Sequence, residues 1–116
     1  MNKYALIAEK AVSYINKGLQ AEDAWEKASC EVYPVGSASQ KKGCPKNAFL
    51  GLFSNDPNVS YSKNAIYAQR AVEILRKNPN RKYSVNELWS LVIDESKTHN
   101  SQMNIVLTLW YKKLIK

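Results

Sequence analysis

The segment Gly43-Cys44-Pro45-Lys46 places a thiol where the residue types predict the start of a helix. Proline is favoured at the first helical position, so we expect the helix to begin at Pro45 with Cys44 at its cap. The unpaired N–H groups and the positive dipole end of a helix favour a thiolate and bound anions there. The sequence therefore predicts an anion-binding site that consists of Lys41, Lys42, Cys44 and Lys46.

A thiol in such surroundings can act as a nucleophile or as a redox sensor. Nucleophilic catalysis usually needs a base, and the one histidine, His99, lies more than fifty residues further along the chain. The alternative for Cys44 is a small buried thiol, and the alternative for His99 is a surface or helix-capping residue. Neither Cys30 nor Cys44 has a second ligand at a zinc-motif spacing. We expect no metal and no cofactor, and the balance is against an enzyme.

The composition is that of one globular domain over residues 1–116, with 45% hydrophobic and 23% charged residues. Two cysteines do not make a disulfide framework, and in a reducing cytosol they are expected to be free thiols. No apolar run approaches the roughly 20 residues that a membrane-spanning helix needs. The N-terminus also lacks a signal-peptide core. We therefore expect a cytoplasmic protein with no membrane partner.

The net charge of +7 is unevenly distributed along the chain. Residues 1–58 contain seven lysines and six acidic residues, a balance of +1, whereas residues 59–116 contain ten Lys or Arg and four acidic residues, a balance of +6. A basic half indicates an anionic partner, most commonly nucleic acid. An acidic protein is a second possible partner, and a basic surface kept for solubility is the third reading.

Apolar residues at helical spacing predict an all-α fold of five or six helices in a single compact domain. The expected helices cover residues 3–17, 21–32, 45–53, 63–77, 85–97 and a last stretch from 100 or 101 onward. Gly18 is a plausible end for the first helix, so the first two should form an antiparallel helical hairpin. Gly51 is expected to permit a close helix contact. Ser84 and Glu87 have the spacing of a capping box.

Two groups of residues in the basic half could contact nucleic acid. Five basic residues around the turn at 78–80 could grip phosphates: Arg70, Arg76, Lys77, Arg81 and Lys82. The alternative for this group is a solvated helix end. A polar strip on the last helix could read base edges if the last two helices formed a helix-turn-helix: Ser101, Asn104, Thr108 and Lys112. The strongly apolar character of that helix, which is typical of a core helix, argues against this second group.

Two sequence blocks resemble a family of small bacterial proteins of unknown function. The first is G-C-P-x-x-A-F-L-G-L, at 43–52, and the second is N-S-Q-M-x-x-V-x-x-L-W, at 100–110, with Glu87-Leu88-Trp89 between them. The resemblance covers much of the chain and implies a bacterial, cytoplasmic, single-domain protein. It implies no activity, cofactor or catalytic residue. This chain has Phe53 where the family pattern suggests a second cysteine nearby, so paired-thiol chemistry would be absent here.

These observations together predict a small basic helical binding or regulatory protein that contacts nucleic acid through its C-terminal half. Two alternatives stay open at this point. One is a protein-interaction module with an acidic partner, and the other is a thiol-dependent enzyme or sensor at Cys44. The oligomeric state is left open by the sequence.

Overall fold

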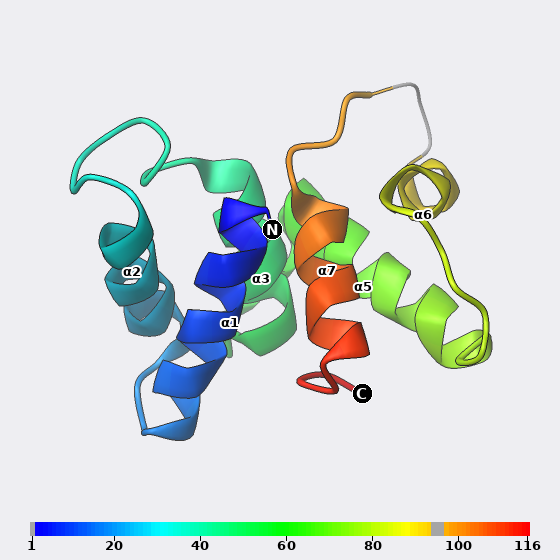
Figure 1. Cartoon of the computed structure of the whole chain (residues 1–116), viewed down its shortest axis with the longest axis horizontal. Coiled ribbons are helices and arrows are strands. Elements are labelled where there is room, and N and C mark those ends of the chain that lie inside the picture. Colours follow the sequence, from blue (N-terminus) through cyan, green and yellow to red (C-terminus); the bar gives the residue numbers. More distant parts are fainter. Residues whose placement is uncertain (1, 94–96) are drawn as a thin grey trace.

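A computed structural model describes residues 2–93 and 97–116, and over these residues the chain is helical with no strand (Figure 1). The helices are α1 (Lys3–Asn16), α2 (Ala21–Val32), α3 (Gly43–Phe53), α4 (Pro57–Ser60), α5 (Lys63–Lys77), α6 (Val85–Val92) and α7 (Gln102–Tyr111). The predicted all-α class is confirmed. The described residues form seven helices where five or six were expected, and the addition is the short α4.

Helix α4 lies between the predicted helices at 45–53 and 63–77, where no helix is predicted from the sequence. Asp56 caps it, because its carboxylate accepts a hydrogen bond from the N–H of Asn58 at 2.9 Å, and Pro57 takes the first helical position. Four residues are too few to show an apolar periodicity, so a search for helical spacing does not find such a helix.

Helices α1 and α2 form the expected antiparallel hairpin (Figure 1). Gly18 reverses the chain with a φ of +107°, a conformation that glycine adopts without strain. The start of α1 is fixed by Asn2, whose side-chain oxygen accepts from the N–H groups of Tyr4 and Ala5 at 2.9 and 3.1 Å. The facing sides of the two helices share one buried cluster, with Trp25 at 1% exposure among its largest members.

Helix α7 lies among the other helices and contacts four of them, α1, α3, α5 and α6. Its side chains contribute to two buried clusters. Ile105 and Leu109 belong to the cluster that includes α1, α2 and α3, and Met103 and Val106 belong to the cluster that includes α5 and α6. The apolar character of this helix is therefore that of a core helix, as its sequence indicates.

Helix α6 ends at Val92, and the predicted extension to Lys97 is wrong where the structure describes it. Ile93 is extended, Lys97 is not helical, and residues 94–96 of the predicted helix lie outside the described residues. Tertiary hydrogen bonds hold this end. An Arg70 guanidinium nitrogen donates to the Val92 carbonyl at 3.0 Å, and the Trp89 indole N–H donates to the Lys97 carbonyl at 2.7 Å. The spacing of apolar residues along the sequence does not predict either of these hydrogen bonds.

Two helices approach each other closely at Gly51, where α3 packs against α5. A Cβ atom placed on Gly51 would lie 2.5 Å from both the Cα and the Cβ of Ala65. Real Cβ atoms do not approach other carbons so closely, so the crossing depends on the missing side chain. The close contact predicted from the sequence is confirmed.

Gly51→Ala is expected to lower the free energy of unfolding by about 1–3 kcal/mol, because the two helices must separate to admit the methyl group. Urea denaturation measures the change. Gly43→Ala is the matched control, since a Cβ there would meet only the side-chain nitrogen of Asn47 at 3.8 Å. Combining Gly51→Ala with Ala65→Gly should recover part of the loss. Equal stabilities for Gly51→Ala and Gly43→Ala would contradict the crossing.

The predicted capping box at the start of α6 is confirmed. The N–H of Glu87 donates to the Ser84 hydroxyl and the N–H of Ser84 donates to the Glu87 carboxylate, each at 3.1 Å. The hydrogen bond from the Ser84 backbone lowers the pKa of Glu87 below its ordinary 4.5, and the positive charge of Arg81 lowers it further by a smaller amount. The carboxylate is therefore stabilised in the folded state.

A depressed pKa gives stability that is present above the unfolded value and is lost as the pH falls through the folded value. The stability advantage of the wild type over Glu87→Gln should therefore be largest above about pH 4.5 and should shrink below it, as measured by urea denaturation from pH 7 to pH 3. Glu73→Gln, which removes an exposed carboxylate of α5, controls for net charge. A difference that stays constant with pH would refute the proposed link between Glu87 ionisation and the cap.

Candidate functional site

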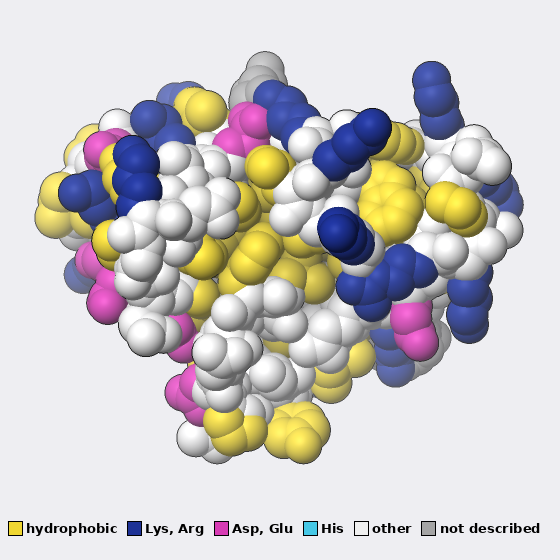
Figure 2. Space-filling model, turned by 90° about the horizontal axis from the view of Figure 1, so that it is seen from below, with side chains coloured by type: hydrophobic (Ala, Val, Ile, Leu, Met, Phe, Trp, Pro, Cys, Tyr) yellow, Lys and Arg dark blue, Asp and Glu magenta, His cyan; other side chains and the backbone are white. Residues whose placement is uncertain are grey.

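Six exposed basic side chains lie where the ends of α5 and α7 meet the start of α6. We call this group the basic surface: Arg76, Lys77, Arg81, Lys82, Lys113 and Lys116. Figure 2 shows the molecule from the side on which the C-terminus lies, with Lys and Arg side chains set around exposed hydrophobic atoms. Four of the six were predicted from the sequence. Lys113 and Lys116 were not among the residues predicted to bind nucleic acid.

Tertiary hydrogen bonds connect the separate segments of the basic surface. The Arg76 guanidinium donates to the backbone carbonyl of Lys116, which ties the end of α5 to the chain after α7. The N–H of Tyr83 donates to the Tyr111 hydroxyl at 3.3 Å, which ties the start of α6 to the end of α7. Arg81 lies over the Tyr83 ring, 4.5 Å from its centroid. The relative positions of the charges are therefore set by the fold.

A tight turn after α7 brings the chain end back over the helix. The N–H of Leu114 donates to the Leu109 carbonyl at 2.8 Å and the N–H of Lys113 donates to the Trp110 carbonyl at 3.0 Å. These are the two bonds of a Schellman motif, and Lys113 occupies its left-handed position with a φ of +59°. Glycine is the usual residue there, so the sequence carries no signal for this turn.

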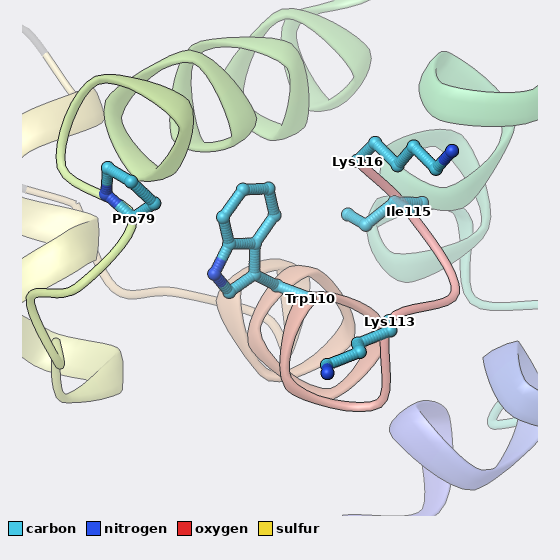
Figure 3. A pocket seen from close by; sticks show the side chains of 5 residues that line it. All are labelled: Pro79, Trp110, Lys113, Ile115 and Lys116. Atoms are coloured by element: carbon cyan, nitrogen blue, oxygen red, sulfur yellow. The ribbon is translucent and has the colours of Figure 1, made fainter.

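The turn completes a pocket of about 440 Å³ beside the basic surface. Its lining consists of Pro79, Trp110, Lys113, Ile115 and Lys116. The half-buried indole of Trp110 projects from α7 between Pro79 and Ile115, and the two lysines come from the segment after the helix (Figure 3). The pocket thus combines an aromatic ring with two cations, and its volume lies within the roughly 300–1,000 Å³ typical of small-molecule sites.

The other residues predicted to bind nucleic acid make structural contacts or are half-buried. Arg70 donates to the carboxyl end of α6, and Lys112 forms an ion pair with Glu9 of α1. The Ser101 hydroxyl accepts a hydrogen bond from the Asn2 side chain at 3.2 Å, and Asn104 and Thr108 are half-buried. The structure therefore does not bring Arg70 or the polar strip of α7 into the basic surface.

The helix-turn-helix outline considered for the two C-terminal helices does not form. Nine residues, 93–101, separate α6 from α7, whereas that motif uses a turn of about 3–4 residues. The contacts that α7 makes with four other helices also occupy the faces that a recognition helix would present to a DNA groove.

Helix α3 begins two residues earlier than the sequence predicted. Gly43 is its first residue, Cys44 its second and Pro45 its third, because proline is tolerated throughout the first turn, where its missing N–H needs no partner. Lys41 and Lys42 are exposed, and the Lys42 ammonium lies 5.9 Å from the centre of the Tyr4 ring. Lys46 is half-buried. Cys44 instead lines a cavity with residues of α5, α6 and the segment before α7.

The remaining candidates for chemistry are separate from the basic surface. Cys30 and Cys44 are free, half-buried thiols. His99 is half-buried, with its ring 6.3 Å from that of Trp89 and nearly perpendicular to it, rather than lying on the surface. Among the described side chains, no three of His, Cys, Asp and Glu gather as metal ligands would. Within the same part of the chain, no helix has the length and apolar character needed to cross a membrane.

The fold and this site define a small all-helical protein with a basic end beside an aromatic pocket. The chain belongs to the DUF6979 family, a family of unknown function whose model matches residues 1–116. A search of curated proteins and a search of solved structures gave no significant match.

The electrostatic character of the Trp110 pocket can be tested without any ligand. Trp25 and Trp89 are 1% and 6% exposed, so a dissolved quencher reaches mainly Trp110. Because the pocket is lined by lysines, the ratio of iodide to caesium quenching at low ionic strength should exceed the ratio for the free compound N-acetyltryptophanamide. The iodide-accessible component should disappear in Trp110→Phe, and Lys113→Gln with Lys116→Gln should reduce the ratio. A ratio equal to that of the free compound would show that the pocket is not electropositive.

Proposed function

We propose that this protein binds nucleic acid through the basic surface and holds an unpaired base against Trp110. The observation that carries the proposal is the Trp110 pocket, whose lining contains an indole and two lysines and which adjoins the four other cations of the basic surface. We place the protein in the cytoplasm, where Cys30 and Cys44 would remain reduced.

The number and exposure of the cations support contact with a phosphate backbone. The six side chains are exposed and come from three chain segments that the hydrogen bonds of Arg76 and Tyr83 hold together. Each lysine or arginine that neutralises a phosphate releases a condensed counterion, so such a surface binds with an affinity that depends steeply on salt. The protein needs no base-reading helix for this mode, since phosphate contacts carry most of the affinity.

The aromatic ring favours a single strand over a double helix. Stacking of a base on an exposed aromatic side chain contributes about 1–3 kcal/mol and tolerates any base, because every base has a π-face. A base inside a duplex is already stacked on both faces, so only an unpaired base can enter the pocket. An acidic protein would satisfy the lysines but has no comparable use for the indole.

The test is fluorescence anisotropy with labelled single-stranded DNA, single-stranded RNA and duplex DNA across a range of salt. We expect tighter binding of the single strands and an affinity that falls linearly on a log–log plot against salt. In the basic-surface variant Lys77→Gln/Lys82→Gln/Lys113→Gln, the slope of log affinity against log salt should become shallower by about 0.7 for each phosphate contact removed.

A matched control removes the same charge from the opposite part of the molecule. Lys10→Gln/Lys17→Gln/Lys27→Gln changes one lysine of α1, the C-cap residue of α1 and one lysine of α2, and should leave the affinity and the slope close to those of the wild type. Equal losses in the two triple variants would mean that only net charge matters and would overturn the site. If poly-glutamate, matched in charge to the single strand, displaced the labelled strand as well as the unlabelled strand does, that result would instead assign the surface to an acidic protein.

A further inference from the structure

We propose a second, separate site: the cavity behind Cys44 binds a small oxyanion of the phosphate class, either free or as the terminal group of a phosphomonoester. The cavity has a volume of about 190 Å³. Its lining consists of Cys44, Lys63, Asn64, Tyr67, Trp89, Lys97, Thr98, Asn100 and Gln102. This volume is below the roughly 300 Å³ at which sites for drug-sized ligands begin, so the occupant is small.

Several polar groups in the cavity lining can donate hydrogen bonds. The Gln102 side-chain nitrogen donates to the Asn64 side-chain oxygen at 2.9 Å, so Asn64 has its NH₂ group left to offer. The Lys97 ammonium donates to the Tyr67 hydroxyl at 3.2 Å, so that hydroxyl can donate its own proton onward. The exposed Lys63 also contributes to the lining. None of the described lining residues is acidic, and a lining with donors and two lysines suits an anion.

Backbone N–H groups add to this donor set, because three helices begin beside the cavity. Cys44 is the second residue of α3, Lys63 and Asn64 are the first two residues of α5, and Gln102 is the first residue of α7. Neither α3 nor α7 has a capping side chain that accepts from its first N–H groups. The positive ends of three helix dipoles and the two lysines therefore all contribute positive potential near the cavity.

The anion site predicted from the sequence and this cavity share Cys44 but differ in their cations. The sequence pointed to the neighbouring Lys41, Lys42 and Lys46, whereas the fold places Cys44 beside the cavity lined by Lys63 and Lys97. A phosphate offers several oxygens in different directions, which matches donors that come from three helix starts and the 97–100 segment. The Trp110 pocket is lined by a different set of residues at the other end of α7, so the two proposals stand independently.

The test is an NMR titration of the ¹⁵N-labelled full chain with sodium phosphate or glycerol 3-phosphate, with ionic strength held constant by sodium chloride. We expect saturable shifts at the amides of Gly43, Cys44, Asn64 and Gln102. Saturation by both compounds, or by only one of them, supports the site and tells a free ion from an esterified group. Absence of saturation with either, or shifts confined to the basic surface, would overturn it.

Variants and a thiol probe localise the effect. Lys63→Gln should raise the Kd for phosphate by about tenfold, whereas the control Lys27→Gln on α2 should leave it unchanged. In the wild type, phosphate should slow the alkylation of Cys44 by iodoacetamide, measured by mass spectrometry, with the half-buried Cys30 as an internal reference. Equal slowing at Cys30 and Cys44 would contradict the site, and this measurement does not depend on any variant folding.

Discussion

The burial of α7 between two hydrophobic clusters is the constraint on which the rest of the structure depends. Ile105 and Leu109 pack toward α1, α2 and α3, while Met103 and Val106 pack toward α5 and α6. One ten-residue helix thus joins the N-terminal helices to the C-terminal ones. Removing a buried Leu or Ile side chain from such a position costs about 2–5 kcal/mol, so the helix has little freedom to change its placement.

A central helix also determines where chemistry can occur, because most of its side chains are buried and each candidate pocket lies at one of its ends. The first residue of α7 lies at the donor-lined cavity, and its ninth residue, Trp110, lies in the basic pocket. The helix itself spans about 15 Å at 1.5 Å per residue, which separates the two candidate sites. One end gathers the starts of three helices, and the other gathers cationic side chains. The two ends therefore suit different anionic partners without sharing a residue.

Local signals predicted most of the fold. The bounds of α2 and α5 and the capping box of α6 follow from cap residues and apolar spacing within a few residues of each helix. The close crossing at Gly51 could also be inferred, because a glycine inside an apolar helix usually marks such a contact. The predicted bounds were wrong at the start of α3, because the first turn of a helix tolerates proline. They were also wrong at the end of α6, where the side chains of Arg70 and Trp89 donate hydrogen bonds to backbone carbonyls.

The sequence by itself determined the helical class, the order of the helices and the excess of positive charge in the C-terminal half, since each depends on residue type and on spacing of a few residues. The tertiary structure alone decided which cations share a surface. It joined Lys116 to Arg76, placed Lys113 and Lys116 in one pocket lining with Trp110, and brought Cys44 into a cavity with Lys63. These groupings join segments twenty to forty residues apart through packing around α7, and no local pattern encodes a contact of that range.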